Sequence, residues 1–204
     1  MRYTGPKARL CRREGVNLFG SPKYQKIIQK NSNIPGMHGG KRMGKVTEYG
    51  KQLREKQKAR RIFCLSEKQF RKYFDQAERS QGVTGDMLMQ GIERRLDNVL
   101  FRAGFAMTRM QSRQFASHGL FLLNGRRVDI PSIQVNIGDK IELKASKKGS
   151  AVFKKILEEL KDYTAPSWLK VDAKHFTIEI VELPVFAHFD QLVELRLIVE
   201  YYSR

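Results

Sequence analysis

The chain has 204 residues, with 39 Lys and Arg against 21 Asp and Glu, which gives a formal net charge of +18. A folded protein with this excess of one sign repels itself, and nucleic acid is the commonest polyanion that compensates it. No apolar run approaches the roughly 18 residues that span a bilayer, and none follows the charged start MRYTGPKARL, as it would in a secretory signal. We therefore expect an intracellular protein with one large or two small domains and no membrane partner.

The two cysteines, Cys11 and Cys64, exclude a disulfide framework and favour a reducing compartment. Cys11 has no C-x-x-C partner, and His38 is a single possible nitrogen ligand nearby. Four soft ligands of the kind that zinc requires cannot be assembled locally. We expect no zinc and no other cofactor, and we interpret both thiols as ordinary packing groups.

Residues 1–46 are rich in Gly, Pro, Lys and Arg, show no sustained periodicity and contain one acid, Glu14. Such a segment buries too little apolar surface to fold alone, so it is either a disordered tail or an extension that RNA orders. We favour the RNA-ordered extension, because the PGMHGGKR stretch would let backbone amides approach phosphates. Its candidate RNA-binding residues are Lys7, Arg9, Arg12, Arg13, His38, Arg42 and Lys45.

The next two segments both predict helices. Residues 47–61 have high helix propensity but are almost wholly polar, so one face is expected to lie on RNA. A capping box at Ser66-x-x-Gln69 then precedes an aromatic stripe at helical spacing, which includes Phe70 and Phe74. Base stacking is one use of such a stripe, but core packing is the simpler interpretation. The RNA-binding candidates here are Arg54, Lys56, Lys58, Arg61 and Arg71.

Residues 94–143 predict two helices followed by short strands. The first helix ends at Gly104, and the second begins at the capping box Thr108-x-x-Gln111 and ends at His118-Gly119. Asn124-Gly125 is a hairpin signal, because both residues accept a positive φ. A further pair of short strands is expected at Val135 and at residues 140–143, on either side of Gly138-Asp139.

The second of these helices carries Arg109 and Arg113 four residues apart, so both project from one face near its N-terminus. A solvated basic face is the simpler alternative, but cations beside helix N-terminal amides also form a phosphate-binding surface. Asp97 is interpreted as the partner of a neighbouring arginine in a structural ion pair. The candidates in this region are Arg94, Arg95, Arg109, Gln111, Arg113, His118, Asn124 and Arg126.

The rest of the chain predicts a helix over residues 152–163 and a strand over residues 176–183. Trp168 is a possible stacking platform, although a lone Trp beside Leu169 and Val171 favours core packing. Residues 192–202 fit both a strand and a helical stripe. The whole pattern predicts an α+β fold: a helical domain, a small RNA-binding module with two helices against a mostly antiparallel sheet, and a basic N-terminal arm.

A TRMQSR helix start, then HG, NG and GD turns, resembles the small RNA-binding module of the family of small-subunit ribosomal protein four. Further blocks are similar to bacterial-type members of that family, in the same order and over nearly the whole chain: RYTGPK, PGMHG, EYGKQLREKQKAR, EKQFRKYF, ERRLDNV and LIVEYYSR.

The resemblance implies a basic extension at 1–46, a helical domain at 47–92 completed by a C-terminal helix at 190–204, and an RNA-binding module with an α/β extension at 93–189, with its core at 94–145. It also implies binding of the 5′ domain of small-subunit ribosomal RNA early in assembly. Contact with small-subunit protein five and other small-subunit proteins, a contribution to translational accuracy, and repression of its own messenger RNA are further implications. The expected location is the ribosome in the cytoplasm, and an organelle-encoded origin stays open.

No catalytic motif is present: the chain has no GxSxG, Walker A or HExxH pattern, and its four histidines have no nearby Ser or Cys arrangement typical of a nucleophile with a base. We therefore predict that it is not an enzyme and takes no small-molecule substrate. The alternative is an RNA-modifying or RNA-quality-control protein that uses the same module. Only about sixty residues follow Leu143, which leaves little room for a catalytic domain.

Overall fold

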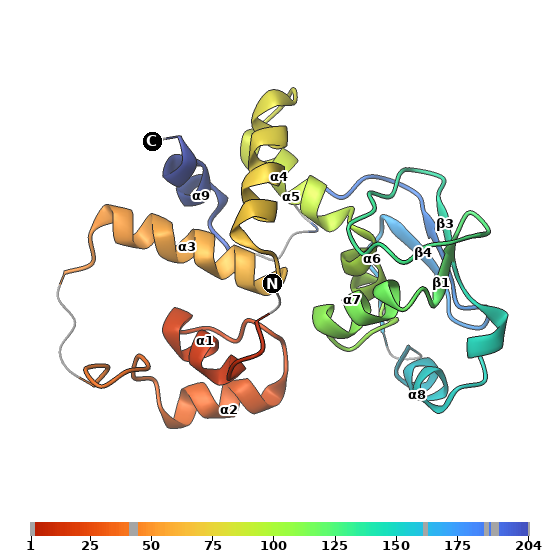
Figure 1. Cartoon of the computed structure of the whole chain (residues 1–204), viewed down its shortest axis with the longest axis horizontal. Helices are drawn as coiled ribbons and strands as arrows, with labels where there is room; N and C mark the ends of the chain where they lie inside the picture. The colour runs from red at the N-terminus through yellow and green to blue at the C-terminus, as the bar shows by residue number, and fades with distance from the viewer. Residues whose placement is uncertain (1–2, 41–44, 161–162, 186–187, 189–191, 204) are drawn as a thin grey trace. The chain divides into compact units, whose positions relative to one another are not determined.

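The computed structural model describes residues 3–40, 45–160, 163–185, 188 and 192–203, and the chain forms two compact units (Figure 1). We call them the helical unit, Met1–Gly85 with Asp190–Arg204, and the sheet unit, Asp86–Phe189. The predicted α+β class is confirmed. By this division residues 1–46 belong to the helical unit, whose first segment ends at Gly85. No helix among the described residues is long and apolar enough to cross a membrane.

The helical unit contains five whole helices among its described residues: α1 (Lys7–Glu14), α2 (Pro22–Lys30), α3 (Glu48–Ile62), α4 (Glu67–Arg79) and α9 (Leu195–Tyr202). α5 (Thr84–Glu93) begins there and continues into the sheet unit. Residues 1–46 contain two helices that the sequence pattern did not predict, α1 and α2, and these pack together. Cys11 and Leu18 are buried. Gly15 ends α1 in the left-handed conformation.

One acid attaches this segment to the rest of the helical unit. The Glu14 side chain is 1% exposed and accepts from the guanidinium groups of Arg54 (3.4 Å) and Arg61 on α3. Burial raises the pKa of Glu14, and the surrounding cations oppose that shift. Glu14, the single acid of residues 1–46, therefore connects α1 to α3.

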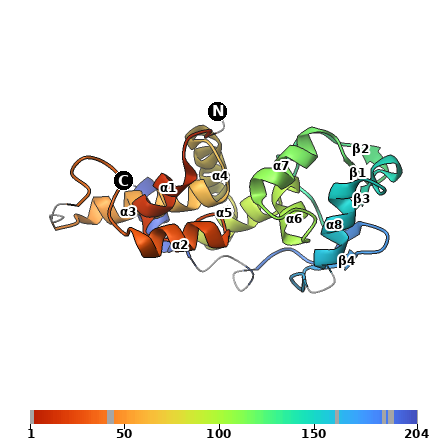
Figure 2. The same cartoon turned by 90° about the horizontal axis from the view of Figure 1, so that it is seen from below.

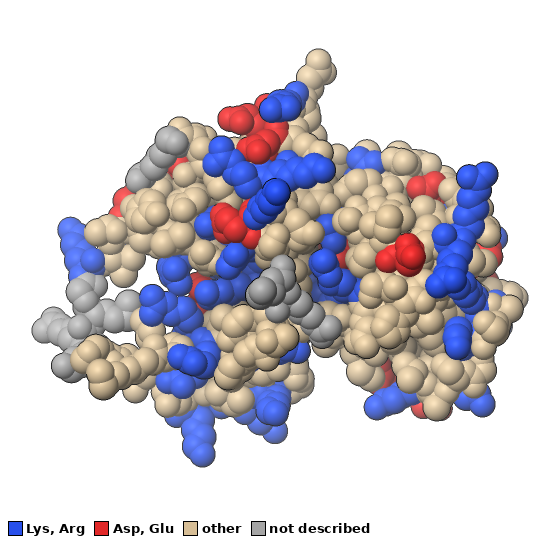
Figure 3. Space-filling model, in the orientation of Figure 1, with Lys and Arg blue, Asp and Glu red and all other residues tan. Residues whose placement is uncertain are grey.

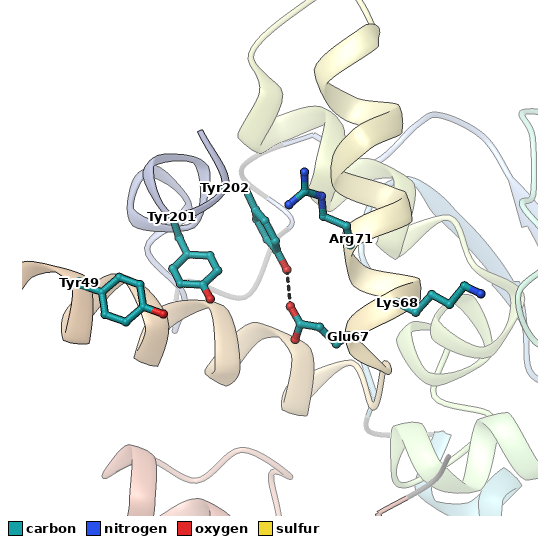
Figure 4. Close-up of a pocket in the computed structure, with 6 residues that line it drawn as sticks. All are labelled: Tyr49, Glu67, Lys68, Arg71, Tyr201 and Tyr202. Atoms are coloured by element: carbon teal, nitrogen blue, oxygen red, sulfur yellow. Dashed lines mark hydrogen bonds between the residues drawn. The ribbon is translucent and has the colours of Figure 1, made fainter. Parts of the chain in front are cut away.

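The C-terminal helix α9 closes the helical unit by packing along α3. The Glu67 carboxylate, in the first turn of α4, accepts from Tyr202 Oη at 2.8 Å (Figure 4). It also accepts from Lys56 Nζ at 2.8 Å. Lys56 also lies over the Tyr201 ring, 4.7 Å from its centroid. The helix implied by the family resemblance is thus present over residues 195–202, and at one carboxylate it meets α3 and α4, which lie more than a hundred residues earlier in the sequence.

The sequence patterns of α4 are confirmed. Ser66 and Gln69 form the predicted capping box, and the stripe residues Phe70 and Phe74 are 0% and 1% exposed. The aromatic rings therefore belong to the core of the helical unit, as the simpler interpretation held.

The sheet unit contains α6 (Leu96–Arg102), α7 (Arg109–Ser117), α8 (Ala151–Leu160) and the 3-10 helix η1 (Ala145–Lys147). Its strands are β1 (Phe121–Leu123), β2 (Arg126–Arg127), β3 (Lys140–Leu143), β4 (Leu169–Asp172) and β5 (Thr177–Ile180). They form one antiparallel sheet in the order β2-β1-β3-β5-β4. In both views α6 and α7 lie beside the sheet (Figures 1 and 2).

Only one face of this sheet is buried. The register pairs Phe121 with Leu143 and Ile141 with Ile178, and these four side chains are at most 2% exposed. They form one core with residues of α6, α7 and α8, and Trp168 belongs to it at 1% exposure, as the core interpretation predicted. The other face carries mixed charge, because Lys140 pairs with Glu142 and Lys170 with Glu179. That face is no uniform basic surface.

Two predictions for the sheet unit, a hairpin turn and a strand, have different outcomes. Asn124 and Gly125 have φ values of 50° and 77°, which confirms the hairpin turn between β1 and β2. The predicted strand at Val135 is wrong. Val135 is fully buried and its amide donates to the Arg94 carbonyl (3.0 Å), next to an isolated bridge between Arg95 and Gln134, because the segment pairs with the start of α6 instead of with the sheet.

The Glu67 contacts predict a specific pH dependence. Burial alone raises the pKa of Glu67, but the hydrogen bonds from Lys56 and Tyr202 outweigh burial and hold it below its usual value of 4.5. The stability contributed by these contacts is therefore present above pH 4.5 and is lost as the pH falls through the lower, folded-state pKa.

We expect Glu67→Gln to lower the free energy of unfolding near neutral pH, and the difference from wild type to shrink between about pH 6 and about pH 3. Urea denaturation at several pH values measures this difference. Asp75→Asn, which disrupts the exposed pair with Arg71, is the control and should change stability little. A constant Glu67→Gln difference across the range would contradict the assigned role.

Candidate nucleic-acid interface

The start of α7 is fixed by its own cap. Thr108 Oγ1 accepts from the Gln111 amide (3.2 Å), and Gln111 Oε1 accepts from the Met107 amide (2.9 Å). This confirms the predicted helix start. It also gives the Gln111 carbonyl oxygen a structural partner, although Gln111 was expected to bind RNA. Arg109 and Arg113 project from the helix that this cap begins.

Arg109 is held by two residues of α6. Its Nε donates to Asn98 Oδ1 at 2.8 Å, and its guanidinium carbon lies 4.4 Å from the centroid of the Phe101 ring. Asn98 in turn donates to the carboxylate of Glu93, which is 0% exposed and also accepts from Arg102 at 2.6 and 3.1 Å. A half-buried arginine on α7 is thus tied to a fully buried carboxylate through one amide.

A second chain of contacts starts from Asp97. Its carboxylate accepts from Arg95 at 2.6 and 3.0 Å and from Arg113 at 3.5 Å. The predicted structural ion pair of Asp97 is therefore present. Arg95 is only 1% exposed, so its expected role in contacting RNA is wrong. Its guanidinium neutralises Asp97 inside the unit and cannot reach a phosphate from there.

The sheet unit contains four more of the predicted RNA-binding residues. Arg94 donates to the Val135 carbonyl (2.9 Å) and to Asn136 Oδ1 (2.5 Å), while Arg126 is exposed on β2, and His118 is exposed at the end of α7. Asn124 is also exposed, but its amide bonds Asp139 (2.8 Å) and the Lys140 backbone (2.9 Å). Those bonds give Asn124 a turn-forming role that accounts for it without RNA.

Arg127 is absent from the predicted set, yet its position next to Arg126 on β2 is defined by packing. A Cβ on Gly119, whose φ is +61°, would lie 2.8 Å from Arg127 Nε. The guanidinium therefore packs closely over the glycine that ends α7. The signal in the sequence was the pair Arg126-Arg127 following HG, but their approach to Gly119 depends on strand pairing that a linear pattern does not give.

The helical unit carries the remaining predicted cations. Blue side chains gather around α1 and α2 with almost no red among them (Figure 3). The outer set is exposed or half-buried and consists of Lys7, Arg9, Arg12, Arg13, His38, Lys45, Arg54, Lys58, Arg61 and Arg71. Arg42 lies outside the described residues. Arg12 donates to the Asn33 carbonyl (2.7 Å), so part of its fork holds the following loop.

Lys56 is a second correction. It is only 4% exposed and its ammonium is paired with Glu67 and stacked on Tyr201, so it cannot serve the predicted RNA contact. The same cluster lines an open groove of about 610 Å³ formed by Tyr49, Glu67, Lys68, Arg71, Tyr201 and Tyr202 (Figure 4). Tyr49 is 49% exposed, so this groove presents aromatic surface together with charges of both signs.

Nothing in the described part of the chain forms a catalytic or metal centre. No group of three His, Cys, Asp or Glu among those residues could hold a metal ion. Ser167 Oγ lies 3.0 Å from His188 Nε2, but His188 Nδ1 accepts from the Val185 amide (3.2 Å). The neutral ring therefore carries its proton on Nε2 and donates to the serine, which is the reverse of what a general base requires.

Comparison with known proteins agrees with this arrangement. The family model described as "Ribosomal protein S4/S9 N-terminal domain" matches residues 2–93, and the model described as "S4 domain" matches residues 94–141. Small ribosomal subunit protein uS4 of Heliobacterium modesticaldum is 48% identical over 100% of this chain and 99% of its own length, and the uS4 proteins of Desulfitobacterium hafniense (49%) and Halothermothrix orenii (48%) have the same coverage. The chain belongs to the uS4 family. The family resemblance seen in the sequence is confirmed.

Gly119 provides a test of the Arg127 packing. We expect Gly119→Ala to lower the free energy of unfolding by about 1–2 kcal/mol, because a non-glycine residue is strained at positive φ, and also to displace Arg127 and weaken RNA binding. Gly125→Ala is the matched control, since Gly125 also has a positive φ (+77°) but has no atom within 4 Å of an added Cβ. Chemical denaturation and RNA titration measure the two effects. Equal loss of RNA affinity in both variants would contradict a role for the Arg127 position.

Proposed function

We propose that this chain is a structural, non-catalytic protein of the small ribosomal subunit that binds ribosomal RNA. The observation that carries the proposal is the pair of α7 arginines, Arg109 and Arg113, each anchored at one side to a buried acceptor, in a chain of the uS4 family. A guanidinium held by its Nε keeps a defined plane, which suits recognition of a phosphate. The relatives' printed name, small ribosomal subunit protein, supports the same conclusion.

Binding of this kind draws its affinity from phosphates and its specificity from RNA shape. Grooves of A-form RNA are read mainly through backbone geometry, so fixed cations on rigid helices discriminate folded junctions better than flexible tails do. We infer that two surfaces contribute to RNA binding, one in the sheet unit and one in the helical unit. In the sheet unit this surface consists of Arg94, Arg109, Arg113, Arg126, Arg127 and His118. In the helical unit it consists of the outer set of exposed or half-buried residues named above.

The finer role follows from the family resemblance. We propose that the RNA target is the 5′ domain of small-subunit ribosomal RNA, bound early in assembly, that the chain contributes to translational accuracy, and that it works on ribosomes in the cytoplasm. Its own messenger RNA is a further candidate ligand. An RNA-modifying enzyme with the same module is the alternative, and assay of transcript RNA for chemical modification separates the two.

A titration of the full chain with a 5′-domain transcript across salt concentrations tests the proposal, with an unrelated structured RNA as competitor. For about ten neutralised phosphates, log K should fall against log salt with a slope of roughly −7 to −9. Tight binding that resists the competitor supports a specific ribosomal RNA site. Equal affinity for both RNAs would reduce the chain to a generic basic binder.

Arg109→Ala with Arg113→Ala should weaken this binding and make the salt slope shallower by about 1.5, because two phosphate contacts are lost. We also expect a loss of about 1–2 kcal/mol in stability, since Asn98 and Asp97 lose partners. Lys170→Ala with Lys174→Ala removes the same charge from exposed positions of the same unit and is the control. An equal change of slope in the control would assign the effect to net charge alone.

For the protein partner, we propose that small-subunit protein five binds at the groove lined by Tyr49, Tyr201 and Tyr202. Exposed tyrosines are typical anchors of protein interfaces, and the presence of Glu67 makes this groove less suited to phosphate than the outer cations are. Tyr49→Ala should weaken binding of purified protein five, measured by calorimetry, and leave RNA affinity unchanged. Tyr3→Ala is the control, because Tyr3 is also an exposed tyrosine (43%) and does not line the groove. Unchanged binding of protein five to Tyr49→Ala would remove the groove from the proposal.

A further inference from the structure

Asn98 lies between a buried carboxylate and an arginine of the proposed RNA surface. It is 3% exposed in the first turn of α6. Its Nδ2 donates to Glu93 Oε2, and its Oδ1 accepts from Arg109 Nε at 2.8 Å. An amide is the side chain of this size that offers a donor at one end and an acceptor at the other.

The orientation of the amide is dictated from below. Glu93 is fully buried, and its two oxygens also accept the fork of Arg102, with Nη2 to Oε1 at 2.6 Å and Nε to Oε2 at 3.1 Å. A carboxylate accepts hydrogen bonds and donates none, so the NH₂ group of Asn98, which is the donor end of the amide, must face it. The carbonyl of Asn98 must then face Arg109.

A second contact also restrains Arg109. Its guanidinium carbon lies 4.4 Å from the ring centroid of Phe101, which is on the same helix as Asn98. The amide fixes one edge of the guanidinium and the ring covers one face of it. An arginine restrained in this way has already lost rotamer freedom that binding would otherwise remove.

We propose that Asn98 is a positioning residue for RNA binding: it presets the Arg109 guanidinium for a phosphate, and Glu93 in turn sets Asn98. This inference rests on the proposed function, in which α7 contacts the RNA backbone. The residue type at position 98 follows from it, because aspartate would place a second carboxylate against Glu93, and an apolar side chain would bond neither Glu93 nor Arg109.

A double-mutant cycle on RNA binding tests the inference with the full chain and the 5′-domain transcript. We expect Arg109→Ala to weaken binding about tenfold and Asn98→Ala about three- to fivefold. In the Arg109→Ala background, Asn98→Ala should weaken binding by less than about twofold, because Asn98 acts only through Arg109. Equal effects of Asn98→Ala in both backgrounds would overturn the inference.

Stability is separated from positioning by a matched amide. Asn17 in the helical unit also uses both ends of its side chain, donating to the Ser21 carbonyl (2.9 Å) and accepting from the Phe19 amide (3.3 Å), and it contacts no arginine through these bonds. Asn17→Ala should combine additively with Arg109→Ala. Active protein is counted by stoichiometric titration, so that partial unfolding does not mimic weak binding.

A charge-preserving variant covers the case in which Asn98→Ala fails to fold. Arg109→Lys keeps the charge but lacks the Nε–H that Asn98 accepts, so it should bind about fivefold more weakly than wild type with an unchanged salt slope. Wild-type affinity in Arg109→Lys would overturn the inference, because charge alone would then suffice. Failure of the wild-type chain to prefer the 5′-domain transcript would instead count against the proposed function, so the two failures are distinguishable.

Discussion

The structure depends on a few buried carboxylates that neutralise arginines from within. A chain with a formal charge of +18 folds against its own repulsion, and an isolated buried charge is costly unless it is paired. Glu14, Glu93 and Asp97 are each nearly inaccessible, and each accepts from at least one arginine. Glu14 holds α1 on α3 in the helical unit, while Glu93 and Asp97 hold α6 and α7 in the sheet unit. These three acids are thus buried against arginines, where they hold helices together.

The same pairs prepare the surface for a polyanion. Asp97 and Asn98 are adjacent in sequence, and each engages one of the two α7 arginines: Asp97 bonds Arg113, and Asn98 bonds Arg109. Both have a second, buried partner: Arg95 donates to Asp97, and Glu93 accepts from Asn98. Breaking either buried pair would therefore disturb both folding and the geometry of α7, which links stability to RNA recognition in this unit. Arg126 and Arg127 are exposed on β2, the short strand at one edge of the sheet.

Local signals in the sequence predicted the local structure well. Side-chain caps at Ser66 and Thr108, the Asn124-Gly125 turn and the aromatic stripe of α4 act within a few residues, and each is present as expected. What depended on distant contacts was missed. The helices within residues 7–30 are stabilised by the burial of Cys11 and Leu18 and by the ion pairs of Glu14 with Arg54 and Arg61. Lys56 lies in a basic segment, and only the folded chain brings Glu67 to it. The ion pair of Asp97 was predicted, but the burial of its partner Arg95 was not, because burial depends on the packing of the whole unit. Charge in a sequence therefore indicates a polyanion as partner, but not which cations are left to meet it.

The central claim is that the α7 arginines are set in place before RNA arrives. The most direct test is side-chain NMR of the arginine Nε–H groups in the free full-length chain, with Arg109 compared with the exposed Arg126. The account predicts slow solvent exchange and restricted motion for the Nε–H of Arg109, whose hydrogen bond to Asn98 shields it, and fast exchange for that of Arg126. Equal exchange and equal motion at the two positions would contradict it, because the guanidinium of Arg109 would then be ordered only by the RNA.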